Sequence, residues 1–209
     1  MRKKIIKRNT DDNNLLFSIL IPTLFSRRYK FLKFSEKLMK QIEDNNLQDK
    51  IEIIAHYDNK KISLSEKRTN LLNSAAGKYL TFLDDDDTVS DDYIISIYNA
   101  IMEESDSDVI SFKQKCNCDG KEFFINCDIN YNFNNTKIGE NIYCRFPWIW
   151  CIWKKELVQD TEFKDPTSRL NYGEDRYWLE RFKHKIKKEK KIDKILHYYI
   201  FNSKESETQ

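Results

Sequence analysis

The chain has 209 residues, of which 40% are hydrophobic, 13% aromatic and 33% charged. Its 36 Lys and Arg nearly balance 34 Asp and Glu, so the formal net charge is only +2. This balance lacks the strong basic character of nucleic-acid-binding domains, and nucleic acid is not an expected partner. The length and composition predict one folded domain. With only four glycines, the chain has no P-loop and no GxGxxG dinucleotide motif.

The sequence gives no sign of a membrane segment or an export signal. The longest apolar stretch, residues 15–25, is interrupted by polar residues and is shorter than the roughly 20 residues that cross a bilayer. The basic residues near the N-terminus are followed by acids and amides, where a signal peptide would have its apolar core. The five cysteines form no CxxC pair of the kind that binds structural zinc. We therefore expect a soluble, cytoplasmic protein with reduced thiols and no integral membrane segment.

The first half of the chain alternates between strand-like and helix-like segments. Short apolar runs typical of buried strands occur, in chain order, at residues 17–22, 51–57, 78–83 and 108–112. Helical segments between them are expected at residues 28–44, 63–77 and 91–104. Ser63 and Glu66 form a capping box for the second helix, which Gly77 is expected to end, and Ser90 is expected to cap the third. The alternation predicts an α/β fold with a mostly parallel central sheet flanked by helices, in which ligands bind beyond the carboxyl ends of the strands.

The pattern changes from residue 113. Asp119 and Gly120 predict a hairpin turn, and sequence rich in Asn and aromatic residues follows. Residues 148–153 and 192–201 are expected to form strands, with a helix at 173–185 between them. We divide the chain into a flexible basic N-terminus and a flexible tail around one α/β domain with two halves. These are residues 1–14 for the N-terminus, 203–209 for the tail, 15–202 for the domain, and 15–112 and 113–202 for its halves.

Four consecutive carboxylates, at residues 84–87, directly follow the third predicted strand. Like charges this close raise one another's pKa, so the cluster needs a compensating cation. Carboxylate oxygens suit Mg²⁺ or Mn²⁺, and Mg²⁺ is commonly held by one or two carboxylates together with substrate phosphates. A solvated acidic turn is the alternative interpretation. The position at the end of a strand favours a divalent metal with a nucleotide diphosphate.

Four segments together resemble the family 2 glycosyltransferases, which have the GT-A fold. They are FSILIPT at residues 17–23, IEIIAHYD at 51–58, SEKRTNLLNSAAGKYLTFLDDDD at 65–87 and GEDRYWLERF at 173–182. The most specific part is residues 67–87, where Arg68, Gly77 and the DxD acids Asp84 and Asp86 fall at the family's spacing. The resemblance extends from residue 17 to residue 202, which is most of the chain.

This resemblance implies transfer of a sugar from a nucleoside diphosphate sugar, most often a UDP-sugar, to an acceptor hydroxyl with inversion at the anomeric carbon. Mn²⁺ or Mg²⁺ is the implied cofactor, because a metal stabilises the negative charge that forms on the departing diphosphate. Residues 15–112 would form the nucleotide-sugar half and residues 113–202 the acceptor half. A glycan, a lipid-linked molecule and a protein all remain open as the acceptor.

The resemblance also assigns residues to the donor side. Asp86 would bind the metal. His197, on the last predicted strand, is a further candidate ligand, and a structural histidine is the alternative. The nucleotide sugar would be held by Pro22, Thr23, Asp58, Arg68, Asp84 and Asp85.

On the acceptor side, Asp175 occupies the position of the family's catalytic acid and would be the general base. A carboxylate within hydrogen-bond reach of the acceptor hydroxyl can take its proton, whereas a plain N-terminal helix acid is the alternative. Trp148 and Trp150 lie two residues apart on a predicted strand and would share one face, offered to a sugar ring, with core packing as the alternative. Glu174 is expected beside them on this acceptor side.

One departure from the family pattern leaves a second function open. The family often has an acidic pair followed by Gly after the second strand, whereas this chain has Tyr57, Asp58 and Asn59. A catalytically silent GT-A-like module that binds a nucleotide or a glycan is therefore the alternative to an enzyme. The retained DxD acids and Asp175 favour the enzyme.

Overall fold

The computed structural model describes residues 5–6, 15–164 and 173–203. The rest of the expected N-terminal segment and residues 204–209 of the expected tail lie outside these ranges. None of the helices in the described ranges combines the length and hydrophobicity that a bilayer-crossing segment needs. The five cysteines are all free thiols.

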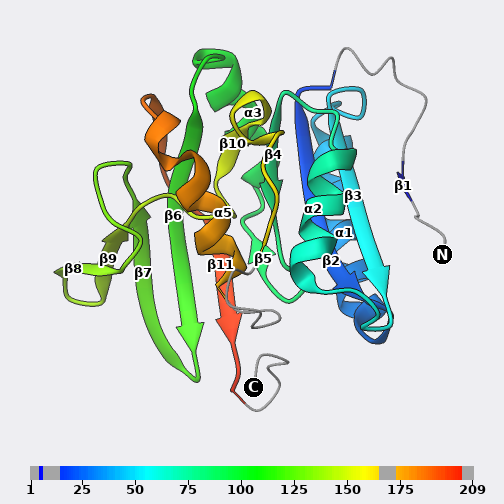
Figure 1. Ribbon diagram of the computed structural model, residues 1–209, viewed down its shortest axis with the longest axis horizontal. Coiled ribbons are helices and arrows are strands. Elements are labelled where there is room, and N and C mark those ends of the chain that lie inside the picture. The colour runs from blue at the N-terminus through cyan, green and yellow to red at the C-terminus, as the bar shows by residue number, and fades with distance from the viewer. Residues whose placement is uncertain (1–4, 7–14, 165–172, 204–209) are drawn as a thin grey trace.

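A single sheet runs through the whole described part of the chain (Figure 1). Its central strands follow the order β3-β2-β4-β10-β6, and β11 pairs with β6 and with the short β5. These strands are β2 (Phe17–Leu24), β3 (Ile51–Asp58), β4 (Tyr79–Phe82), β5 (Thr88–Val89), β6 (Val109–Cys118), β10 (Ile152–Lys154) and β11 (Glu189–Phe201). The sheet continues at its edges through β1 (Ile5–Ile6), β7 (Lys121–Cys127), β8 (Thr136–Gly139) and β9 (Ile142–Arg145).

The central strands run mostly in one direction, which confirms the predicted sheet. Strand β2 is parallel to both β3 and β4, and β11 is parallel to β6. Strand β10 is antiparallel to both β4 and β6, so β4 and β6 also share a direction. Along the order β3-β2-β4-β10-β6, only β10 therefore runs against the other strands, and the short β5 is antiparallel to β11.

Helices cover both faces of this sheet, because successive crossovers step in opposite directions. The connection through α1 (Arg28–Asp44) leads from β2 to β3. The connection through α2 (Leu64–Ser74) leads from β3 back across β2 to β4. Right-handed crossovers then place α1 and α2 on opposite faces, and Figure 1 shows α2 in front of the sheet. The remaining helical elements are η2 (Phe25–Arg27), α3 (Tyr93–Glu103), α4 (Lys155–Val158), α5 (Glu174–Phe182) and η3 (Lys183–Lys185).

The core is one continuous cluster of buried apolar side chains. All residues of β4 and nearly all of β2 are buried, as expected for strands covered on both faces. Helix α5 joins this core through Trp178, whose ring lies edge-on to Trp153 with centroids 6.1 Å apart. Because α5 is anchored by aromatic packing, its first turn has a fixed position over the sheet.

Most expected elements are confirmed, one of them with both of its expected boundaries. The helix at residues 28–44 is α1, and the Ser63 side chain accepts the Glu66 N–H at 3.1 Å in the predicted cap of α2. Asp119 and Gly120, with φ of 49° and 83°, form the turn between β6 and β7. The hairpin prediction is therefore correct.

Three local predictions are wrong. The strand expected at 148–153 begins only at Ile152, so Trp148 and Trp150 lie in the turn before β10 and do not share a strand face. Ser90 does not cap α3, because its hydroxyl donates to Asp92 at 2.7 Å. Helix α2 ends at Ser74, before the glycine expected to end it.

Gly77 instead lies where two segments of backbone approach closely. Its N–H donates to the Ser18 hydroxyl at 2.8 Å, and that hydroxyl donates to Glu52 at 2.7 Å. A Cβ at residue 77 would lie 2.7 Å from the Ser18 backbone nitrogen. The glycine is required because there is no room for a side chain.

We expect Gly77→Ala to lower the free energy of unfolding by about 1–3 kcal/mol, because the new methyl group clashes with the backbone of β2. Urea unfolding measures this change. Gly139→Ala is the matched control, since the nearest atom to its new Cβ would be an Ile142 side-chain carbon at 3.5 Å. Equal effects of the two substitutions would contradict the close-approach explanation.

Candidate functional site

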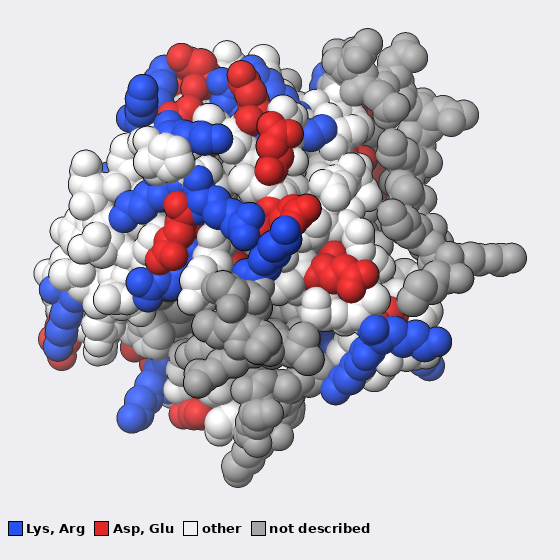
Figure 2. Space-filling view, viewed as in Figure 1, with Lys and Arg blue, Asp and Glu red and all other residues white. Residues whose placement is uncertain are grey.

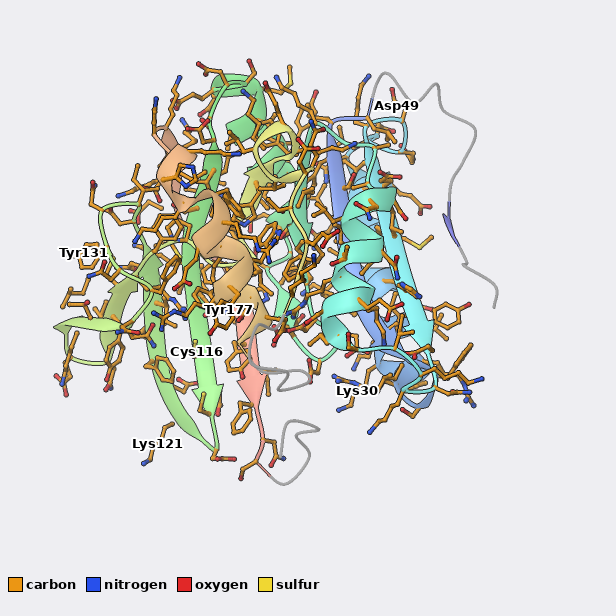
Figure 3. The ribbon with its side chains drawn as sticks, viewed as in Figure 1. Lys30, Asp49, Cys116, Lys121, Tyr131 and Tyr177 are labelled. Carbon is orange, nitrogen blue, oxygen red and sulfur yellow. The ribbon has the colours of Figure 1, made fainter. Side chains whose placement is uncertain are left out.

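The site lies at the edge of the sheet where β2, β3 and β4 end. Lys30, labelled in Figure 3, marks this edge at the start of α1, and Asp49 marks the opposite edge, just before β3 begins. Polar residues that follow parallel strands meet at one such edge, which is where α/β proteins bind ligands. Pro22 and Thr23 lie at the end of β2, and the four carboxylates follow β4.

Asp58 is held in place by a network at the ends of β2 and β3. The Lys67 ammonium lies 2.6 Å from one Asp58 oxygen and donates to the Thr23 carbonyl at 2.8 Å. The backbone N–H groups of Lys61 and Ile62 donate to the other oxygen of Asp58. Burial raises the pKa of Asp58, but the bonds from Lys67 and these N–H groups outweigh it and hold the pKa below its usual value. Where the family pattern often has two acids, this chain has only Asp58, and Lys67 and two backbone N–H groups hold that carboxylate in place.

The four carboxylates of the acidic loop, residues 84–87, alternate between exposed and buried. The side chains of Asp84 and Asp86 are 41% and 42% exposed, whereas those of Asp85 and Asp87 are 2% and 5% exposed. The first and third acids of the loop therefore face the site, and the second and fourth face the interior. This alternation matches the two positions of the DxD motif.

The buried Asp85 connects the loop to β2 and η2. One Asp85 oxygen accepts from the Thr23 hydroxyl, and the other lies 2.5 Å from the Arg27 guanidinium. The same guanidinium nitrogen lies 2.5 Å from Asp86. Burial raises the pKa of Asp85 to about 6, although Thr23 and Arg27 lower it. Arg27 therefore supplies positive charge to two neighbouring carboxylates.

The buried Asp87 connects the loop to β11. His197 Nε2 lies 3.2 Å from Asp87, and the Nδ1 atom of the same ring is 2.8 Å from the Gln114 side-chain nitrogen. The His197 ring stacks on Trp150, with centroids 5.5 Å apart. Burial raises the pKa of Asp87 to about 6, with His197 lowering it. His197 Nδ1 is thus paired with Gln114, whereas the buried Nε2 has no hydrogen-bond partner beyond its contact with Asp87. Trp150, 6% exposed, offers little surface to a sugar.

Arg68 joins the acidic loop to α5. Its guanidinium is ion-paired with Glu174 through one nitrogen and lies 3.1 Å from Asp84 through the other. The side chains of Arg68 and Glu174 are only 4% and 5% exposed. Burial raises the pKa of Glu174, and the Arg68 charge partly offsets this. The expected donor residue Arg68 and the expected acceptor-side residue Glu174 are therefore in direct contact.

Asp175 follows Glu174 in the first turn of α5, and both of its oxygens are oriented. The Trp148 indole N–H donates to one oxygen at 2.7 Å, and the backbone N–H of Arg176 donates to the other at 2.7 Å. The Arg145 guanidinium lies 3.5 Å from the centre of the Trp148 ring. Trp148 therefore orients the expected base, and Arg145 covers one of the ring faces expected to meet a sugar.

Two cations of this site, Arg27 and Lys67, are not among the residues expected from the sequence. Arg27 follows the end of β2 directly across from the acidic loop, and Lys67 precedes Arg68 in the most specific segment of the resemblance. A basic residue soon after a strand that ends beside an acidic loop is the signal that could have identified Arg27.

The acidic loop has the chemistry of a site for a hard divalent cation. Among the described residues, no group of three or more His, Cys, Asp and Glu side chains is arranged to hold a metal. Mg²⁺ and its relatives are commonly held by one or two carboxylates plus substrate phosphates, and the half-exposed Asp84 and Asp86 fit that description. Part of the positive charge that a metal would supply to the acidic loop comes from the protein itself, through Arg27 and Arg68.

The comparisons with known proteins identify the family of this chain. The family model of glycosyl transferase family 2 matches residues 33–155, more than half of the 209-residue chain. The chain therefore belongs to glycosyl transferase family 2. Glycosyltransferase GlyA of Streptococcus pneumoniae serotype 4 is 32% identical over 94 residues, which are 43% of this chain and 14% of GlyA.

Solved structures show the same fold. S. aureus TarS 1-349 in complex with UDP-GlcNAc has a TM-score of 0.61 and 16% identity, over 90% of this chain and 59% of that chain. Its complex with UDP has a TM-score of 0.58 and 15% identity, over 90% of this chain and 61% of that one. The expected GT-A fold is confirmed. This chain thus spans about three fifths of the TarS structures and a seventh of GlyA.

We expect Arg68→Met to destabilise the fold by about 3–5 kcal/mol at neutral pH, because it leaves Glu174 buried without its cation. Burial already raises the pKa of Glu174, and loss of Arg68 raises it further. The folded state then binds a proton more readily than the unfolded chain, so the loss of stability grows with rising pH and shrinks on acidification. Urea unfolding from about pH 8 to about pH 5 measures this dependence.

The double variant Arg68→Met, Glu174→Gln tests the cause. Removing the carboxylate charge should restore part of the stability and flatten the pH dependence. A loss that is the same at every pH and is unchanged by Glu174→Gln would contradict the buried-charge explanation.

Proposed function

We propose that this chain is a metal-dependent inverting glycosyltransferase that transfers a sugar from a nucleoside diphosphate sugar to an acceptor hydroxyl. The observation that carries the proposal is the continuous connection from the exposed acids of the DxD motif, through Arg68 and Glu174, to the oriented carboxylate of Asp175. Family membership and the TarS complex with UDP-GlcNAc support a nucleotide sugar as donor, with a UDP-sugar as the first candidate.

The donor would bind at the ends of β2, β3 and β4. Asp84, half exposed, would lie against the ribose, and Pro22, Thr23 and Asp58 would form the pocket for the base. The buried Asp85 would act indirectly, since it fixes Arg27 and Thr23. Arg68 would act in the same way, by setting the position of Asp84.

Mn²⁺ or Mg²⁺ would be held by Asp86, together with the donor diphosphate. When bound, the metal stabilises the negative charge on the departing diphosphate. Asp86 would have to exchange its contact with Arg27 for this role. His197 could serve the metal only through Nε2, which lies 3.2 Å from Asp87, because Nδ1 is paired with the Gln114 side chain.

Asp175 would be the general base. The acceptor oxygen attacks the anomeric carbon, the bond from that carbon to the diphosphate oxygen breaks, and the hydroxyl proton passes to Asp175. A carboxylate can do this only when an oxygen lies within hydrogen-bond reach of the hydroxyl. The N–H groups of Trp148 and Arg176 fix the orientation of both Asp175 oxygens, which leaves their remaining lone pairs for the acceptor.

A catalytically silent nucleotide-binding or glycan-binding module is the second candidate. One observation favours it: Arg27 lies 2.5 Å from both Asp85 and Asp86, where it balances charge that a metal would otherwise balance. Such a module would have no need for an oriented carboxylate like Asp175, which is why we prefer the enzyme.

The first test is thermal unfolding of the protein with a panel of nucleoside diphosphates and their sugars, each with Mn²⁺ or with EDTA. A ligand at about 100 times its dissociation constant should add about 2.7 kcal/mol to the free energy of unfolding. A stabilisation that requires Mn²⁺ would support the donor site and identify the base. The absence of any stabilisation by the whole panel would overturn the proposal.

Substitutions then separate donor binding from chemistry. Asp175→Asn should leave metal-dependent UDP binding nearly unchanged and reduce transfer by about 10²–10⁴-fold, the usual contribution of a general base. Asp86→Asn should weaken UDP binding in Mn²⁺ but not in EDTA. Asp91→Asn, at a side chain that is 97% exposed, is the control and should change neither. Calorimetric titration and sugar-transfer assays provide the two readouts, and equal UDP affinity of Asp86→Asn and wild type would contradict the metal assignment.

A further inference from the structure

Three cations surround a small aromatic cluster next to Asp175. The cluster consists of Phe133, Phe146 and Trp148. The Phe133 ring centre lies 5.2 Å from that of Phe146 and 6.1 Å from that of Trp148. The cations Arg145, Arg176 and Lys183 all lie over its rings. None of the proposed steps on the donor side uses these cations.

Arg145 has no carboxylate partner among the described residues. Its guanidinium lies 3.5 Å from the centre of the Trp148 ring, and its Nε is buried without a hydrogen-bond partner. Burial lowers the pKa of Arg145, in contrast to Arg68, whose carboxylate neighbours raise its pKa. The Arg145 side chain is only partly buried, so a ligand can reach it. A guanidinium in this position can still bind an anion.

Lys183 is a second cation without a carboxylate in the described part of the chain. Its ammonium lies 4.6 Å from the Phe133 ring centre and 4.7 Å from that of Phe146, and it donates to the Tyr131 carbonyl at 3.4 Å. Arg176 differs, because it is paired with Glu180 at 3.0 Å. Two of the three cations over the aromatic cluster, Arg145 and Lys183, are therefore not ion-paired with a carboxylate among the described residues.

These cations lie on the acceptor side of the proposed base. Trp148 is in contact with Arg145 through its ring face and with Asp175 through its N–H, so a single indole separates the guanidinium from the carboxylate. The charges of Arg145 and Asp175 also act on each other. One small acceptor molecule could thus place an anionic group at Arg145 and its hydroxyl at Asp175, the proposed base.

We propose that Arg145 and Lys183 form an acceptor subsite for an anionic group, a phosphate or a carboxylate, carried by the acceptor close to the hydroxyl that receives the sugar. This inference rests on the proposed function and specifies its acceptor class. The planar guanidinium binds phosphate and carboxylate oxygens with two parallel hydrogen bonds. The Trp148 ring holds the guanidinium plane in place, so little side-chain freedom is lost on binding.

The proposed subsite is local and not part of a broad basic surface. Lys and Arg are interspersed with Asp and Glu over the face that carries α5 (Figure 2). The net charge of +2 also provides little general attraction for anions. Binding of an anionic acceptor therefore depends on Arg145 and Lys183 themselves.

The test uses the indole N–H signal of Trp148 in the full chain, assigned among the four tryptophans by Trp148→Phe. The protein is titrated with glycerol 3-phosphate, with glucuronate and with neutral glycerol, in the presence and absence of UDP and Mg²⁺. At least one of the two anions should shift the Trp148 signal saturably, and glycerol should not. A response to glycerol 3-phosphate alone assigns a phosphate acceptor, and one to glucuronate alone a carboxylate.

Arg145→Gln should weaken binding of the responding anion by about tenfold or more, as expected for loss of a charge-assisted pair. Arg145→Lys should weaken it less, because the charge remains while the two-pronged geometry is lost. Lys183→Gln should also weaken binding of this anion. It replaces Arg145→Gln as the test variant if Arg145→Gln does not fold. The control Arg181→Gln removes an exposed cation of α5, two residues before Lys183, and should leave the affinity unchanged.

A signal that neither anion shifts, or equal affinities in wild type and Arg145→Gln, would overturn the subsite. UDP titration of the same samples separates this result from failure of the proposed function. If UDP binds and the anions do not, only the subsite is wrong. If no nucleotide binds to the wild-type protein, the donor assignment is wrong whatever the anions do.

Discussion

The whole site depends on one buried cation, Arg68. Its guanidinium is the point where the acidic loop after β4 and the first turn of α5 meet, through Asp84 and Glu174. Glu174 is almost fully buried, and a buried carboxylate is tolerated only when it is paired. Because Asp175 is the next residue, the pairing of Glu174 also sets the position of the proposed base. The two ion pairs of Arg68 therefore determine the distance between the proposed donor side and the proposed acceptor side.

The acidic loop shows how four adjacent carboxylates can have different tasks. The two inward-facing acids contact other protein groups. Asp85 contacts Thr23 and Arg27, and Asp87 contacts His197. Their contacts fix the backbone, so that the two outward-facing acids are presented at a constant spacing. Electrostatic preorganisation of this kind lowers the cost of reorganising the site when charge develops on a bound diphosphate.

The fold and the contact of Arg68 with the acidic loop could be predicted from the sequence, whereas the surroundings of Trp148 could be predicted only in part. Strand-helix alternation, the Ser63 cap and the spacing of Arg68 with the acidic loop are local patterns, and the structure contains all of them. The strand expected across Trp148 was wrong because apolar side chains in a turn before β10 have the same composition as a strand. The roles of Arg27 and Arg145 depend on contacts between segments distant in sequence, and no local pattern encodes them.

The position of β10 has a consequence for how the chain reaches its native state. This strand comes late in the sequence, yet it is inserted between β4 and β6, and it is antiparallel to both of them. Until it is inserted, β4 and β6 both have unpaired backbone groups along their edges, and such edges promote association with other chains. Residues 15–112 therefore should not be regarded as an independent folding unit, although they contain most of the proposed donor site. The sheet is completed only when residues 113–202 have contributed β10, so we expect nascent chains to pass through a stage in which they are prone to aggregate.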